Sequence, residues 1–123
     1  MFDWGEVLEI FRTLLASTME PREAVARTVA SRAYYFAFHR CRRAVERNAD
    51  MPLAAEASVH AIVIRRLGEQ QETRSISLDL DRLRGNRAHA DYNADRPFLE
   101  SKAEVAIELA SEISQAIERE LGD

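Results

Sequence analysis

The sequence is poor in cysteine, glycine, proline and lysine, and each shortage limits what the chain can be. Only 4 Gly and 3 Pro occur among 123 residues, whereas alanine occurs 19 times. Because glycine and proline form turns and interrupt helices, this composition favours a helical fold over a turn-rich β fold. The single cysteine, Cys41, excludes an internal disulfide framework and a four-cysteine zinc site. No apolar run approaches 18 residues, so no membrane span is predicted.

The length and the polarity of the chain predict a single soluble domain over residues 1–123. Hydrophobic residues make up 46% and charged residues 31% of the sequence, which argues against an intrinsically disordered chain. The first residues, Met1 to Trp4, include the acidic Asp3 and no basic segment, so no secretory signal is predicted. The cytoplasm is therefore the expected compartment.

The formal net charge of −4 is unevenly distributed. Residues 22–47 contain seven Arg and two acidic residues, and residues 82–96 contain four Arg and two acidic residues, while the remaining segments are acidic. Lys102 is the only lysine. The overall sign argues against non-specific coating of nucleic acid, which depends on neutralising many phosphates. Two basic segments still leave room for a local anion site if the fold brings them together.

Apolar residues at spacings of three and four predict four or five helices. The predicted helices span about 2–16, 22–47, 54–72, 78–96 and 99–121. Gly68 is expected to end the regular part of the third helix, and Pro97 is expected to end the fourth. Ser75 and Ser77 are candidate N-caps of the fourth helix, and Gly85 and Asn86 weaken its helix propensity. Gly122 is the expected stop of the last helix. The predicted fold is all-α, a four- to five-helix up-and-down bundle.

The long second helix has two notable rows of side chains. One consists of small residues with Tyr34 and Cys41, which predicts close approach of a neighbouring helix and a structural role for the cysteine. The other is a basic and aromatic stripe, which a helix would form from Arg32, Tyr35, His39 and Arg42. This stripe is a candidate for holding a phosphate and stacking a base. The alternative is an amphipathic helix whose Tyr and His lie at the edge of the bundle.

Polar side chains are concentrated around His89 in the fourth helix. At about 100° per residue, Arg82 and Asn86 project on nearly the same side as His89. Arg84 lies about 140° away and reaches His89 only if the helix is distorted near Gly85. An imidazole beside a guanidinium can transfer protons while the cation stabilises phosphate charge. The alternative is a solvated, salt-bridged helix face.

The remaining chemistry-bearing residues give weaker signals. His60 stands among apolar neighbours, which is typical of a packed histidine with one hydrogen bond. No HExxH motif, nucleophile elbow or phosphate-binding glycine loop occurs, so neither a metal nor a cofactor is predicted.

Three phrases together resemble the HEPN family. They are SRAYYFAFH at 31–39, SVHAIVIRRL at 58–67 and LRGNRAHADY at 83–92, and the similarity covers roughly residues 22–121. The resemblance implies a HEPN-type helical bundle that forms a homodimer and acts as a metal-independent endoribonuclease. In active members an Arg and a His with four to six residues between them line a cleft between two protomers. Arg84 or Arg82 with His89 matches that spacing.

The resemblance also assigns supporting residues and partners. Arg87, Asp91 and Tyr92 belong to the family's Arg-x-x-Ala-Asp-Tyr phrase, and Arg87 corresponds to its structural arginine. In relatives that pair with a nucleotidyltransferase antitoxin, a nearby tyrosine is modified.

Three functions follow from these observations. The first is an RNA-cleaving toxin of a toxin–antitoxin pair, with Arg84 and His89 as catalytic residues. The second is a non-catalytic nucleotide- or RNA-binding module that partners a nucleotidyltransferase. The third is a purely structural helical dimer, supported by the long apolar second helix.

Overall fold

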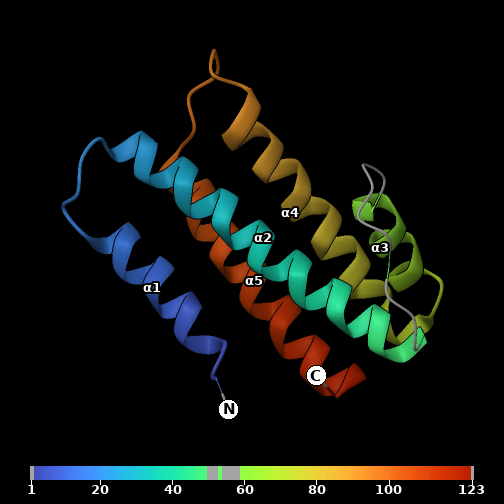
Figure 1. The fold of residues 1–123 in the computed structure, drawn as a ribbon. Helices are drawn as coiled ribbons and strands as arrows, with labels where there is room; N and C mark the ends of the chain where they lie inside the picture. Colours follow the sequence, from blue (N-terminus) through green and yellow to red (C-terminus); the bar gives the residue numbers. More distant parts are fainter. Residues whose placement is uncertain (1, 50–52, 54–58, 123) are drawn as a thin grey trace.

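The computed structural model describes residues 2–49, 53 and 59–122 (Figure 1). Over these ranges the chain is helical and contains no strand. Its elements are α1 (Gly5–Ala16), α2 (Arg22–Ala49), α3 (Val59–Gly68), the short 3-10 helix η1 (Gln71–Thr73), α4 (Arg74–Tyr92) and α5 (Glu100–Leu121). The prediction of an all-helical bundle is therefore confirmed.

Helix α2 lies at the centre of the bundle, since it contacts α1, α3, α4 and α5. Figure 1 shows α5 alongside α2, with α1 on one flank and α4 on the other. The chain direction reverses from α1 to α2 and from α4 to α5. The two predicted basic segments, on α2 and α4, therefore lie on helices that pack against each other.

Small side chains allow α2 and α5 to approach closely, as the alanine-rich pattern predicts. Each helix has a row of residues with no exposed surface. On α2 and α5 these include Ala26, Ala30, Ala33, Ala37, Cys41, Ala44, Ala103, Ala106 and Ala110.

Two arginines of α2 are occupied in holding the ends of neighbouring helices. The guanidinium of Arg22 donates to the carbonyl oxygens of Leu15, Ser17 and Met19, near the C-terminus of α1. Arg27 donates to four carbonyl oxygens at and after the end of α4, those of His89, Ala90, Asn93 and Arg96. Because helix C-termini leave carbonyl groups without internal partners, these cations satisfy them and complement the helix dipole.

The fourth helix differs from its prediction at both ends and in its middle. It begins at Arg74, so Ser75 and Ser77 lie inside it and neither is its N-cap. The Ser77 hydroxyl instead donates to the Ile64 carbonyl oxygen at 2.7 Å, which ties α4 to α3. The helix runs without interruption through Gly85 and ends at Tyr92, five residues before Pro97. Burial of Leu80 and Leu83 outweighs the weak propensity of a single glycine.

The other boundaries shift by a few residues. Helix α1 begins at Gly5 and α2 continues to Ala49. The third helix ends at Gly68 as expected, although its predicted first residues, 54–58, lie outside the described part of the chain. Gly122 follows α5 with a φ of 69°, which confirms it as the stop. Among the helices described, none is both long and apolar enough to cross a membrane.

Candidate functional site

The regular geometry of α4 separates the predicted catalytic residues into two groups. Arg87 packs on the rings of Tyr34 and Tyr35 of α2. Arg84, one turn earlier on α4, is near enough for its charge to act on both Tyr34 and His60. Asn86 and His89 face α5, where both contact Lys102. Because the helix is undistorted, Arg84 and His89 stay about 140° apart around its axis. Within one chain the structure does not bring this pair together.

His89 is half-buried between α4 and the start of α5. Its Nδ1 atom lies 3.1 Å from Nζ of Lys102, and its Nε2 atom lies 3.3 Å from the carbonyl oxygen of Arg96. An ammonium group only donates and a carbonyl only accepts, so Nδ1 is the acceptor and Nε2 carries the proton. The edge of the imidazole packs on the ring of Phe98, with centroids 5.1 Å apart. His89 therefore contacts the only lysine of the chain through one ring nitrogen and a backbone carbonyl group through the other.

Asn86 strengthens the same contact with α5. Its amide nitrogen donates to the backbone carbonyl oxygen of Lys102 at 3.0 Å. Its side-chain oxygen is buried and has no hydrogen-bond partner in the structure as described. Asn86 therefore positions the Lys102 backbone, while His89 contacts the Lys102 ammonium.

Arg82 shares the side of α4 that His89 occupies but lies two turns away, about 10 Å along the axis. Its side chain is 67% exposed, and its guanidinium pairs with Asp79 at 3.7 Å. Neither Arg82 nor Arg84 contacts His89 within one chain. The choice between the two arginines stays open.

Arg87 is a buried guanidinium enclosed by aromatic rings. Its Cζ atom lies 5.0, 5.3 and 5.4 Å from the ring centroids of Tyr34, Tyr35 and Tyr92. It donates to the Tyr92 hydroxyl at 3.0 Å and lies 3.6 Å from the Asp91 carboxylate. Asp91 also accepts a hydrogen bond from Ser31 of α2 at 3.1 Å. The phrase Arg87-x-x-Ala-Asp91-Tyr92 thus joins α4 to α2 by cation–π and polar contacts.

Tyr34 of α2 and His60 of α3 form a hydrogen-bonded pair beside Arg87 of α4. The Tyr34 hydroxyl lies 2.5 Å from Nδ1 of His60, and the imidazole stacks on Phe38 with centroids 4.1 Å apart. Burial raises the pKa of Tyr34 to about 12. Burial, followed by the charges of Arg84 and Arg87, lowers the pKa of His60 below its ordinary value. The phenol therefore donates to Nδ1, and Nε2 of the neutral imidazole carries a proton.

The predicted basic and aromatic stripe on α2 continues from this group. The Cζ atom of Arg32 lies 5.2 Å from the centroid of the Tyr35 ring. The His39 ring stacks against the same tyrosine, with ring centroids 6.2 Å apart. Arg32 and His39 are exposed. Arg42 is engaged locally, because it donates to the Leu53 carbonyl oxygen at 2.7 Å and pairs with Glu46. Three of the four stripe residues therefore lie together at the surface or near it.

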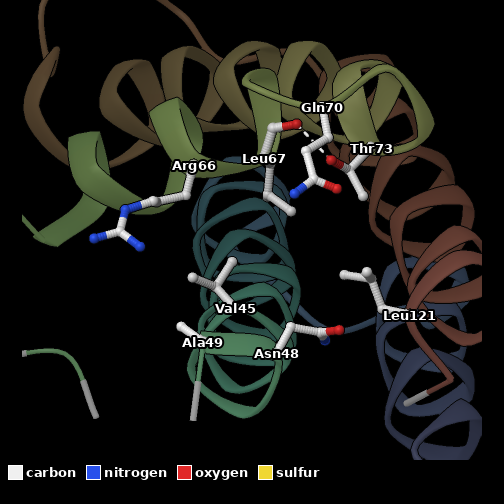
Figure 2. A pocket seen from close by; sticks show the side chains of 8 residues that line it. All are labelled: Val45, Asn48, Ala49, Arg66, Leu67, Gln70, Thr73 and Leu121. Carbon is white, nitrogen blue, oxygen red and sulfur yellow. Dashed lines mark hydrogen bonds between the residues drawn. The ribbon is translucent and has the colours of Figure 1, made fainter. Parts of the chain in front are cut away.

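Two further features lie apart from these groups. Burial raises the pKa of the Cys41 thiol to about 12, which suits the structural role predicted for it. A cavity of about 300 Å³ lies between α3, η1 and the C-terminal ends of α2 and α5. Figure 2 shows the side chains that line it. Its lining contains one guanidinium, that of Arg66, and none of the predicted site residues.

Sequence reasoning missed Lys102 and underrated Tyr34 and His60. The single lysine of an arginine-rich chain was a signal for Lys102, but nothing local linked it to His89. Tyr34 belongs to the row of mostly small residues that is predicted to pack against a neighbouring helix, and it is indeed buried. His60 does make the hydrogen bond expected of a packed histidine, yet it is only half-buried.

Neither a metal cluster among the described residues nor a match to a known protein defines this site. Over the described ranges, no group of three or more His, Cys, Asp or Glu side chains is placed to hold a metal ion. The sequence matches no protein-family model, no curated protein and no solved structure. The similarity to HEPN proteins therefore stays a prediction.

Proposed function

We propose that the chain is a metal-independent endoribonuclease of the HEPN type, acting as a homodimer and serving as the toxin of a cytoplasmic toxin–antitoxin pair. The observation that carries this proposal is the contact between His89 and Lys102. An imidazole that can move a proton, next to an ammonium group, is suited to phosphodiester cleavage without a metal.

The chemistry assigns a step to each group. When an RNA phosphate arrives, the Lys102 ammonium moves to a phosphoryl oxygen and leaves Nδ1 of His89 free. Nδ1 takes the proton of the ribose 2′-hydroxyl, whose oxygen bonds to phosphorus while the bond to the 5′-oxygen breaks. The leaving oxygen takes a proton from a protonated His89 of the second copy. The products are a 2′,3′-cyclic phosphate and a 5′-hydroxyl.

An arginine of α4 completes the proposed site. Arg84 or Arg82 of one copy stabilises the pentavalent phosphate that forms at His89 of the other copy. Sharing between copies is needed because Arg84 and His89 lie on different sides of α4 in one chain. Guanidinium groups suit this task because their planar donors match phosphate oxygens.

The test is cleavage of single-stranded and structured RNA in EDTA. Removing a general acid–base residue costs about 10²–10⁴ in rate, so we expect His89→Ala to reduce cleavage by that factor. Lys102→Gln is expected to slow cleavage and Lys102→Arg to restore part of it. Arg119→Gln is the matched control, because it removes an exposed charge from the last turn of α5. The proposal is wrong if the wild type leaves RNA intact or if His89→Ala cuts equally well.

A second candidate function is supported by the same site. Both ring nitrogens of His89 are engaged, by Lys102 and by Arg96, so the imidazole is not free to take a proton in this arrangement. That favours a non-catalytic RNA- or nucleotide-binding module, and the resemblance to HEPN proteins implies a nucleotidyltransferase as its partner. Binding of RNA without cleavage in the assay above would select this function.

A further inference from the structure

The side of α4 opposite His89 gathers three hydrogen-bond donors from two helices. They are the guanidinium groups of Arg84 and Arg87 on α4 and the Nε2 proton of His60 on α3. Tyr34 of α2 leaves the imidazole proton of His60 on Nε2, because the Tyr34 hydroxyl forms a hydrogen bond with Nδ1 of the same ring. His60 and Arg84 are half-buried, so the group reaches the surface.

This group carries more positive charge than its neighbours neutralise. Arg84 makes no ion pair within the described ranges, and Arg87 has one carboxylate, that of Asp91, at the long distance of 3.6 Å. Arg42, whose charge also acts on His60, is paired with Glu46. The positive charges of Arg84, Arg87, His39 and Arg42 all disfavour a proton on His60. An anion would lower the energy of this arrangement.

Arg87 also has an unmet hydrogen bond. Its side chain is 9% exposed, and its Nε atom is buried without a hydrogen-bond partner in the described structure. The aromatic rings around it attract the charge but accept no conventional hydrogen bond from Nε. A buried donor without a partner is costly, and native structures usually provide a partner, a water or a ligand.

We propose that His60, Arg84 and Arg87 form a receptor for one phosphate group. The three side chains offer donors and no acceptor, which suits an anion and repels a metal cation. Two guanidinium forks match the tetrahedral oxygens of phosphate, and Nε2 of His60 supplies a third direction of contact. The half-buried ring of Tyr35 beside Arg87 would contact a base attached to that phosphate.

This receptor lies within one chain and does not use His89, although it shares Arg84 with one of the two arrangements proposed for cleavage. The ligand class is a phosphate monoester or diester, and three probes identify its source. Inorganic phosphate reports the phosphate alone, adenosine 5′-monophosphate reports a nucleotide, and adenosine reports the base without the phosphate.

The experiment combines calorimetry with NMR of the histidine rings at constant ionic strength. We expect inorganic phosphate and adenosine 5′-monophosphate to bind and to move the ring signals of His60, and adenosine to bind far more weakly. Arg84→Gln should weaken phosphate binding about tenfold, the usual effect of losing a charge-assisted hydrogen bond. Arg74→Gln is the matched control, because it removes an exposed arginine from the first residue of the same helix.

The outcomes separate this receptor from non-specific attraction and from the ribonuclease. Equal weakening by Arg74→Gln, or binding without any change at His60, would overturn the proposal. Tighter binding of adenosine than of the monophosphate would do so as well. His60→Gln tests the same site without deleting a charge and is expected to weaken phosphate binding. His89→Ala should bind phosphate normally even if RNA is never cleaved.

Discussion

The Tyr34 hydroxyl donates a hydrogen bond to Nδ1 of His60 at 2.5 Å, across the packing of α2 against α3. This contact decides which ring nitrogen carries the proton. Burial and the nearby cations Arg84 and Arg87 lower the pKa of His60, and the neutral imidazole keeps Nδ1 available as the acceptor that the buried phenol needs. The pair therefore links the stability of the α2–α3 contact to pH.

We expect the stability of the protein to fall in mild acid through His60. The pKa of His60 is lowered in the folded chain, so the unfolded chain binds more protons below the ordinary value of 6.5. The contribution of neutral His60 is complete above about pH 6.5 and is lost as the pH falls toward the lower folded value. Urea unfolding of the wild type and of His60→Gln at pH 7.5 and 5.5 measures it.

That experiment compares how much unfolding free energy the wild type and His60→Gln each lose between the two pH values. The groups that face His60 are Tyr34, Tyr35, His39 and Arg42 on α2 and Arg84 and Arg87 on α4. All of them remain in the variant, so only the titration of His60 itself is removed. The wild type should lose more unfolding free energy between the two pH values than His60→Gln. Equal losses would contradict the prediction.

Removing the Tyr34 hydroxyl should destabilise the bundle. Tyr34→Phe keeps the buried ring but leaves Nδ1 of His60 without a donor, which costs about 1–3 kcal/mol. Tyr35→Phe is the control, since no hydrogen bond is described for its hydroxyl, and its change should stay within about 0.5 kcal/mol. Urea unfolding at pH 7.5 measures both. Similar midpoints for Tyr34→Phe and the wild type would show that the contact contributes little.

Arg27 should stabilise the connection from α4 to α5. Arg27→Gln removes donors from four carbonyl oxygens, and we expect a loss of about 2–3 kcal/mol in unfolding free energy. Amide hydrogen exchange should rise selectively around residues 93–98. Arg12→Gln is the control, because Arg12 forms an exposed pair with Glu9 and should change stability by less than about 1 kcal/mol. Unchanged exchange around 93–98 would refute this role.

The sequence pattern was sufficient for the fold and insufficient for the site. Spacings of three and four residues predict the helices because burial of one helix face is a local property of the sequence. The Arg27 contacts join residues 62 to 69 positions apart, and the Tyr34–His60 contact spans 26 positions. Such contacts depend on how helices pack, which periodicity does not encode. Part of the basic charge on α2, at Arg22 and Arg27, consequently serves the fold.

The assignment of His89 illustrates the same limit. Helical geometry correctly placed Asn86 with His89 and away from Arg84. It gave no indication of Lys102, which reaches His89 only because the chain turns between Tyr92 and Glu100. The distortion near Gly85 that Arg84 would need in order to reach His89 is absent, because buried neighbours keep α4 regular.

Gly85→Ala should therefore stabilise the protein. Gly85 lies in the exposed middle of a regular helix, and an added Cβ atom would meet nothing within 4 Å. Replacing glycine by alanine in a helix interior contributes about 0.5–1 kcal/mol. Gly122→Ala is the opposing control, since Gly122 has a positive φ of 69° and alanine is strained there. Thermal and urea unfolding should rank Gly85→Ala above the wild type and Gly122→Ala below it, and a destabilised Gly85→Ala would mean that α4 is distorted at this residue in solution.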